Sequence, residues 1–98
     1  MKKTVNTFSQ ILNQELPDLK KQFHIASLEL FGSYVRGEQD TNSDLDILVT
    51  FSNSPTMFEF IKLENHLSEL LGVKVDLVMR SALKPNIGKH ILSEARPI

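Results

Sequence analysis

The stretch SLELFGSYVRGEQDTNSDLDILVTF, residues 27–51, decides the fold. Its first five residues alternate between polar and apolar and run into Gly32, as a strand that ends in a tight turn does. The segment 45–51 (LDILVTF) has the β-branched and aromatic residues of a second strand. The connection between them is too short for a crossover helix. We therefore expect antiparallel neighbours, with Gly32 and Ser33 beside the start of the second strand.

A helix is predicted before this hairpin. Apolar residues recur at helical spacing from Thr7 to about Asn13, and Thr7 with Gln10 fits a capping box. Pro17 interrupts the pattern. It either kinks one helix or occupies the first turn of a second helix, and the sequence alone does not choose between these arrangements.

A longer helical stripe follows the hairpin. It runs over residues 56–71, where Thr56 and Glu59 indicate a capping box and Gly72 a natural stop. The next segment, 73–79 (VKVDLVM), predicts a third strand. A long helix between the second and third strands favours a parallel pair with a right-handed crossover.

A final helix is expected from about Asn86 to Ala95, entered through Pro85. The predicted fold class is therefore α/β (α+β), with a small mixed sheet of three strands or slightly more and helices packed on it. We expect residues 1–98 to form a single domain, because a chain of this length has little room for a second core.

Composition narrows the classes of function. The chain has 11 Lys and Arg against 12 Asp and Glu, so direct binding of nucleic acid through bulk charge is not expected. It has no cysteine, which excludes disulfides and thiolate metal sites. The N-terminus begins with lysines but lacks the unbroken apolar run of a signal peptide or membrane span. We expect a soluble, cytoplasmic protein.

Three aspartates point to chemistry. Asp44 and Asp46 stand two apart at the start of a strand, so their side chains share a face, and Asp76 in the third strand can face the same side. Any one of them alone is more often a turn cap or a surface residue. Each close pair would repel by about 4 kcal/mol at an effective dielectric near 20. Magnesium would neutralise them, and two such ions can serve a phosphoryl-transfer site.

The Gly32-Ser33 pair has two readings. Such a pair is most often a plain turn, but it can also present backbone N–H groups and a hydroxyl to phosphate oxygens at a helix start. Arg36 follows within one turn and could pair with a triphosphate, although an arginine there is as often a surface or salt-bridge residue.

The string GSYVRGEQDTNSDLD, a Gly-Ser followed by ten residues and Asp-x-Asp, resembles the signature of the DNA polymerase beta-like nucleotidyltransferase superfamily. The likeness extends over nearly the whole chain to its minimal nucleotidyltransferase (MNT) branch, through segments such as LPDLKKQF and ALKPNIGKHILSEA. It implies the nucleotidyltransferase fold. It also implies that Gly32 and Ser33 hold a nucleoside triphosphate and that Asp44 and Asp46 bind two Mg²⁺ ions.

The resemblance further implies that Asp76 completes the metal site and helps to deprotonate an acceptor hydroxyl, while Arg36 matches the arginine of the family's GS-x-x-R-G stretch. MNT proteins are similar to antitoxins paired with a helical HEPN ribonuclease toxin, onto which they are thought to transfer AMP from ATP. The chain would then be an enzyme of the protein adenylyltransferase type. Its partner would be a HEPN-type toxin, although a second copy could also supply the missing binding surface.

Two other functions remain open at this point. The chain could neutralise its partner by contact alone, as a binding module, or it could act as a nucleotidyltransferase on a small molecule. The second is disfavoured because the chain has no separate acceptor-binding domain. A neighbouring reading frame for a small helical protein with an R-x₄₋₆-H motif would favour a protein acceptor or the contact mechanism.

Overall fold

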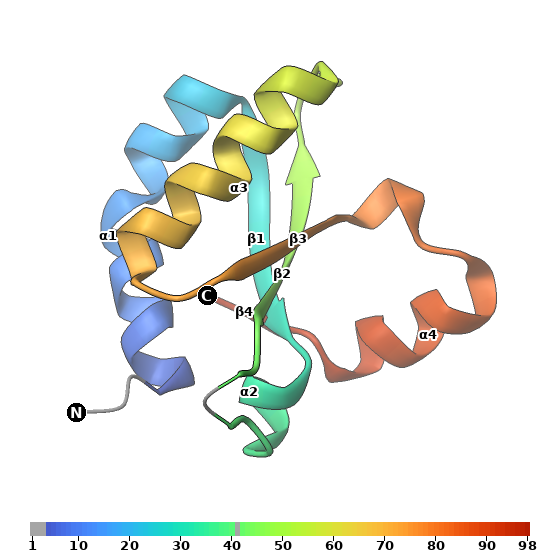
Figure 1. Cartoon of the computed structure of the whole chain (residues 1–98). Coiled ribbons are helices and arrows are strands. Elements are labelled where there is room, and N and C mark those ends of the chain that lie inside the picture. The colour runs from blue at the N-terminus through green and yellow to red at the C-terminus, as the bar shows by residue number, and fades with distance from the viewer. Residues whose placement is uncertain (1–3, 41) are drawn as a thin grey trace.

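A mixed sheet of four strands forms the centre of the protein, in the order β3-β2-β1-β4. The computed structural model describes residues 4–40 and 42–98. The helices α1 and α3 lie side by side on one face of the sheet, and α4 lies on the other side (Figure 1). In chain order the elements are α1 (Val5–Phe23), β1 (Ile25–Phe31), α2 (Ser33–Arg36), β2 (Leu45–Phe51), α3 (Met57–Leu71), β3 (Val75–Met79), the 3₁₀ helix η1 (Arg80–Ala82), α4 (Pro85–Glu94) and β4 (Arg96–Pro97).

The pairing of the first three strands confirms the predicted topology. β1 and β2 are antiparallel, and β2 and β3 are parallel on either side of the α3 crossover. In the resulting register Asp46 of β2 lies opposite Phe31 of β1 and opposite Asp76 of β3. The fourth strand, β4, was not predicted. It pairs only two residues with β1 and contains Pro97, so it is too short to show an alternating pattern.

The first helix differs from the prediction at its start. Thr4, not Thr7, is the N-cap, and its side-chain oxygen accepts a hydrogen bond from the Thr7 backbone N–H at 3.4 Å. The Thr7–Gln10 capping box is therefore wrong, because the helix begins almost one turn earlier than expected. Pro17 lies inside one continuous helix, which resolves the alternative in favour of a single element. The helix ends at Phe23, and its C-cap His24 has a left-handed φ of 56°.

The later helices begin and end where the sequence indicates. Thr56 and Glu59 form the expected capping box, with hydrogen bonds of 3.0 and 3.1 Å, and Gly72 ends α3 in the left-handed conformation. The last helix has Pro85 in its first turn, where the missing N–H costs nothing, and it stops at Glu94.

The main core lies between the sheet and the two packed helices. Fully buried side chains from α1, α3, β1 and β2 meet there: Phe8, Leu12, Leu30, Ile47, Leu63 and Leu67. Because side chains alternate along a strand, Asp46 and Leu48 point to the opposite face of the sheet. The core thus fixes the face on which the aspartates stand.

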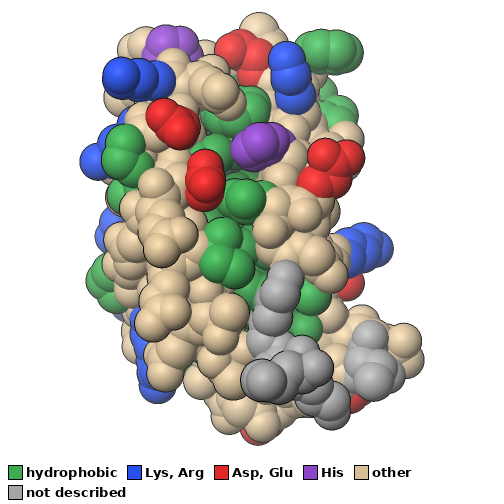
Figure 2. Space-filling view, turned by 90° about the vertical axis from the view of Figure 1, so that its left-hand side faces the viewer, with side chains coloured by type: hydrophobic (Ala, Val, Ile, Leu, Met, Phe, Trp, Pro, Cys, Tyr) green, Lys and Arg blue, Asp and Glu red, His purple; other side chains and the backbone are tan. Residues whose placement is uncertain are grey.

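The surface over α1 and α3 carries charges of both signs. Figure 2 shows acidic and basic side chains interspersed on this face, among uncharged and hydrophobic atoms. This distribution agrees with the net charge of −1 and offers no concentrated basic surface on the side shown. Within residues 4–40 and 42–98, no helix is long and apolar enough to cross a membrane.

Candidate functional site

The register of the sheet places two of the three aspartates, Asp46 and Asp76, next to each other. Asp46 and Asp76 are direct partners across the parallel β2–β3 pair, so their side chains share the face opposite the main core. Asp44 precedes β2 by one residue, and Lys74 approaches its Oδ2 at 4.0 Å. The backbone N–H of Leu45 donates to the Lys74 carbonyl at 2.8 Å, which ties the start of β2 to the start of β3.

Gly32 lies against Asp46. A Cβ placed on Gly32 would come within 2.8 Å of the Asp46 Cγ and 3.1 Å of its Cβ, and closer still to Oδ2. The glycine also has φ 85° and ψ −157°, a conformation that is essentially restricted to glycine. Two independent features, the backbone conformation and the close approach, therefore require glycine at this position. The plain-turn reading accounts only for the first of them.

Burial and the neighbouring carboxylates both affect the charge of Asp46. Burial raises its pKa from 3.8 to about 6, and the charges of Asp76 and Asp44 add to the increase, while Arg36 acts in the opposite direction. A carboxylate whose negative form is disfavoured in this way gains from a nearby cation. Asp76, in contrast, is exposed, so it can meet a molecule that approaches from solution.

The short helix α2 begins directly beside this cluster. Gly32 is its N-cap, and the backbone N–H groups of Val35 and Arg36 return to the Gly32 carbonyl at 3.1 and 3.2 Å. Within the described part of the chain, the N–H groups of Ser33 and Tyr34 donate to no protein acceptor. These free donors and the Ser33 hydroxyl are suited to an anion.

Arg36 is placed by two glutamates. Its Nε donates to the Glu38 Oε2 at 2.8 Å, and its Nη1 donates to the Glu94 Oε1 at 2.6 Å. Both contacts raise the pKa of the guanidinium, Glu38 more than Glu94, so the group stays protonated. The structure therefore shows Arg36 as a salt-bridge residue, and its contact with a triphosphate stays a prediction. The pattern GS-x-x-R carried no signal for its partner Glu94, which is 58 residues away in the chain.

The loop between α2 and β2 is held by its own side chains. The Asp40 Oδ1 accepts from the Asn42 N–H at 2.8 Å, and the Asp40 N–H donates to the Ser43 hydroxyl at 2.9 Å. Such Asx-type bonds shape a turn without help from a sheet or helix. They lead the chain into β2 with Asp44 and Asp46 placed at its start.

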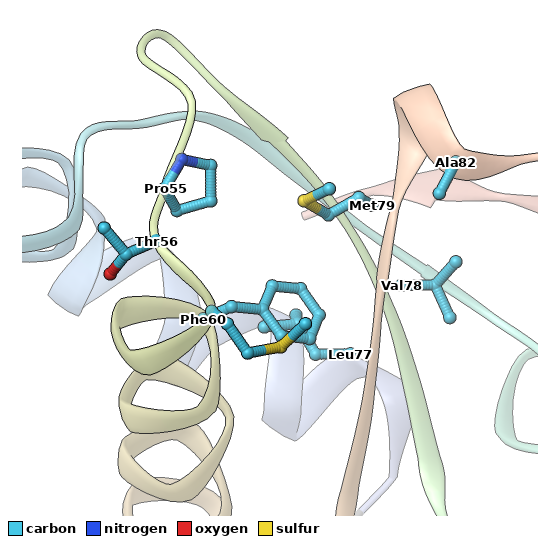
Figure 3. A pocket seen from close by; sticks show the side chains of 8 residues that line it. Pro55, Thr56, Phe60, Leu77, Val78, Met79 and Ala82 are labelled. Carbon is cyan, nitrogen blue, oxygen red and sulfur yellow. The ribbon is translucent and has the colours of Figure 1, made fainter.

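A hollow elsewhere on the molecule differs in its chemistry from the aspartate cluster. It lies between the start of α3, β3 and η1, has a volume of about 340 Å³, and is lined by apolar side chains such as Phe60, Leu77 and Met79 (Figure 3). It presents no carboxylate and no basic side chain. The residues that line this hollow therefore offer no ligand for a metal ion and no positive charge for a phosphate.

The nucleotidyltransferase domain model matches residues 9–98. This chain belongs to the nucleotidyltransferase domain family. The match covers the Gly32-Ser33 turn and all three aspartates, so the chain is a nucleotidyltransferase, as its motif predicts. The resemblance to the minimal branch of this superfamily is confirmed as well, as the following relatives show.

This nucleotidyltransferase is similar to known proteins both in sequence and in structure. It is 45% identical over 91 residues to the protein adenylyltransferase MntA of Thermococcus cleftensis, covering 93% of this chain and 92% of the relative. A solved structure, provisionally described as a minimal nucleotidyltransferase, aligns with a TM-score of 0.80 at 32% identity, over 98% and 97% of the two chains. These matches confirm the predicted α+β fold class.

A more distant structure contains a complex. It is a tri-AMPylated HEPN toxin of Shewanella oneidensis with an MNT antitoxin, and it aligns with a TM-score of 0.65 at 20% identity, over 91% of this chain and 70% of the other. At that identity the likeness establishes the shared fold.

The donor set of this nucleotidyltransferase fits magnesium bound together with a substrate. Among the described residues, no three His, Cys, Asp or Glu side chains form a ready metal cage. Magnesium usually takes only one or two carboxylates and completes its shell with water and substrate phosphates. Asp44 and Asp46 offer those carboxylates, and the raised pKa of Asp46 marks where a positive charge would relieve repulsion.

Proposed function

We propose that this nucleotidyltransferase transfers AMP from ATP to a hydroxyl group of a partner protein, and that it acts as the antitoxin of a HEPN-type toxin. The observation that carries the proposal is that Gly32, which directly follows β1, lies against Asp46 of β2, and that Asp46 pairs with Asp76 of β3. A glycine turn thus stands beside a half-buried carboxylate and an exposed one. The name of the Thermococcus cleftensis relative, protein adenylyltransferase, supports a protein acceptor.

In this proposal the α2 turn binds the triphosphate. The N–H groups of Ser33 and Tyr34, the Ser33 hydroxyl and the Arg36 guanidinium donate to its oxygens. Gly32 lets the phosphate chain approach the backbone, because it has no Cβ between the turn and Asp46. Asp44, Asp46 and Asp76 would hold two Mg²⁺ ions, which when bound neutralise phosphate charge and stabilise the pyrophosphate leaving group.

The acceptor approaches from the exposed side of β3. The carboxylate of Asp76 takes the proton of the acceptor hydroxyl as its oxygen attacks the α-phosphorus of ATP. A new oxygen–phosphorus bond forms, and the bond between the α-phosphorus and the bridging oxygen of pyrophosphate breaks. The products are the AMP-modified partner and pyrophosphate.

The proposal includes a partner because the described surface encloses little. A nucleotide site normally buries most of its ligand in a concave pocket, whereas Asp76 is exposed and α2 is a single short turn. A docked toxin, or a second copy of this chain, would supply the remaining walls. Contact between α4 and the toxin would serve this purpose, since Ile87 and Leu92 of α4 are 59% and 40% exposed.

The test uses ATP labelled at either the α- or the γ-phosphate. The purified chain is incubated with Mg²⁺ and with the product of the neighbouring reading frame, and the intact mass of each protein is measured. We expect the partner to gain one or more AMP units and to carry the α label but not the γ label. A stable complex without any label would favour neutralisation by contact. Label found on a small molecule alone would favour the small-molecule enzyme.

A further inference from the structure

The ion pair between Arg36 and Glu94 joins two parts of the chain that the motif does not connect. The Nη1–Oε1 distance is 2.6 Å, and the Glu94 side chain is only 13% exposed, against 65% for Glu38, the other partner of Arg36. Exposed ion pairs contribute little to stability. Here the Glu94 carboxylate is covered while the Arg36 side chain is 45% exposed, so one side of the guanidinium is held and the other can meet a ligand from solution.

The backbone on both sides of Glu94 is held by regular structure. It is the last residue of α4, and the N–H of Ala95 closes the helix by donating to the Ile91 carbonyl at 2.9 Å. The chain then enters β4, where Arg96 pairs with Leu30 of β1. Since β1 runs directly into the Gly32 turn, this pairing fixes the end of α4 relative to the start of α2.

The guanidinium of Arg36 still has unused donors. Its Nε and one Nη1 hydrogen are taken by the two glutamates, and within the described residues no protein acceptor takes the Nη2 hydrogens. The charges of Arg36 and Glu94 both reach Asp46, so the pair stands close to the carboxylate that lies against Gly32. A guanidinium fixed on two sides has little rotational freedom left to lose when a further anion binds.

We propose that Glu94 is a positioning residue for the nucleotide, because its carboxylate holds the Arg36 guanidinium in the orientation that meets the triphosphate at α2. This inference rests on the proposed function, in which Arg36 contacts ATP. It adds the end of α4 to the nucleotide site, although α4 lies outside the Gly-Ser and Asp-x-Asp motif. Glu94 acts through hydrogen-bond acceptance and not through contact with the substrate.

The experiment is a titration of the full-length chain with ATP and Mg²⁺ by calorimetry. Glu94→Ala removes the acceptor and releases Arg36, and we expect the Kd for ATP to rise about 3- to 10-fold, as the loss of one immobilised side chain predicts. Glu94→Gln keeps an acceptor oxygen, so its Kd should stay within about twofold of wild type. Glu38→Ala should have a smaller effect than Glu94→Ala, since the Glu38 side chain is mostly in solvent.

Two controls separate positioning from a general loss of structure. Glu29→Ala removes another long-range ion pair, the 3.5 Å contact between Glu29 and Arg80, and should leave the Kd unchanged. In an Arg36→Ala background, Glu94→Ala should cause no further loss of ATP affinity. Circular dichroism melting shows whether each variant is folded at the titration temperature.

The contradicting results are distinct. Unchanged or tighter ATP binding by Glu94→Ala would overturn the inference, and tighter binding would indicate that Glu94 competes with the triphosphate for Arg36. An effect of Glu94→Ala that persists without Arg36 would overturn it as well. If the wild-type chain itself binds no ATP, the proposed function fails and the positioning role fails with it.

Discussion

The contact between Gly32 and Asp46 makes a prediction whose size can be worked from the structure. Replacing Gly32 by alanine imposes a side chain on φ 85° and ψ −157°, which costs about 1–3 kcal/mol of backbone strain. The added Cβ also collides with the Asp46 carboxylate, and forced overpacking of this kind costs about 1–3 kcal/mol. We therefore expect Gly32→Ala to lower the free energy of unfolding by about 2–6 kcal/mol.

Gly37 provides a matched control in the same turn. It has φ 71° and ψ 23°, and a Cβ there would meet nothing within 4 Å. Gly37→Ala should therefore cost only the left-handed strain, about 1–2 kcal/mol. The assay is urea unfolding followed by circular dichroism, without metal or nucleotide. Titration with ATP should show that Gly37→Ala still binds the nucleotide and that Gly32→Ala does not.

A double-mutant cycle isolates the collision from the strain. Asp46→Ala removes the Cγ and Oδ2 atoms that the new Cβ would strike and leaves the Cβ, at 3.1 Å. Gly32→Ala should therefore be about 1–3 kcal/mol less costly in the Asp46→Ala background than in the wild type. Zero coupling between the two positions would refute the reasoning, because it would mean that Gly32 and Asp46 do not touch.

Further predictions concern the aspartates. The pKa of Asp46 is about 6 in the folded chain and near its ordinary value when unfolded, so the ionised carboxylate disfavours folding. In urea unfolding, the free energy of unfolding of Asp46→Asn should equal that of the wild type below about pH 4. The variant should become the more stable protein between about pH 4 and 6. Above that range its advantage should be about 1–2 kcal/mol, after allowance for solvent screening. If the difference in free energy of unfolding between the two proteins is the same at every pH, Asp46 does not have a raised pKa. In a second test, Mg²⁺ with ATP should raise the melting temperature of the wild type. The double variant Asp44→Asn, Asp46→Asn should lose the metal-dependent part of that rise, and an equal rise in both proteins would remove the metal assignment.

Much of the fold follows from local patterns. The hairpin from Gly32 to Asp46 and the parallel crossover were predictable because alternation, connection length and capping residues all point to one topology. The start of α1 was not predictable, because Thr4 and Thr7 can both act as an N-cap. The structure shows that Thr4 does so. Strand β4 was not predicted because a strand of two residues is too short to show an alternation of polar and apolar residues.

The candidate site divides in the same way. Asp46 and Asp76 could be grouped from the sequence, since strand alternation and the expected pairing place them on one face, whereas Asp44 precedes β2 and is not part of that pairing. The partner of Arg36 could not, because Glu94 reaches it across 58 residues through the end of α4. The contact between Gly32 and Asp46 depends on the register of two strands, and no local pattern encodes a register to the nearest ångström.

The measurement that tests the proposed mechanism most directly compares the wild type with Asp76→Ala in two assays on the same samples. Each protein is purified with its helical partner by co-elution and then incubated with α-labelled ATP and Mg²⁺. Asp76 is exposed and faces away from the core, so its loss should leave the fold and the complex intact. We predict that Asp76→Ala retains the partner and transfers no label to it. Transfer at the wild-type rate by Asp76→Ala would contradict the assignment of Asp76 as the residue that activates the acceptor hydroxyl.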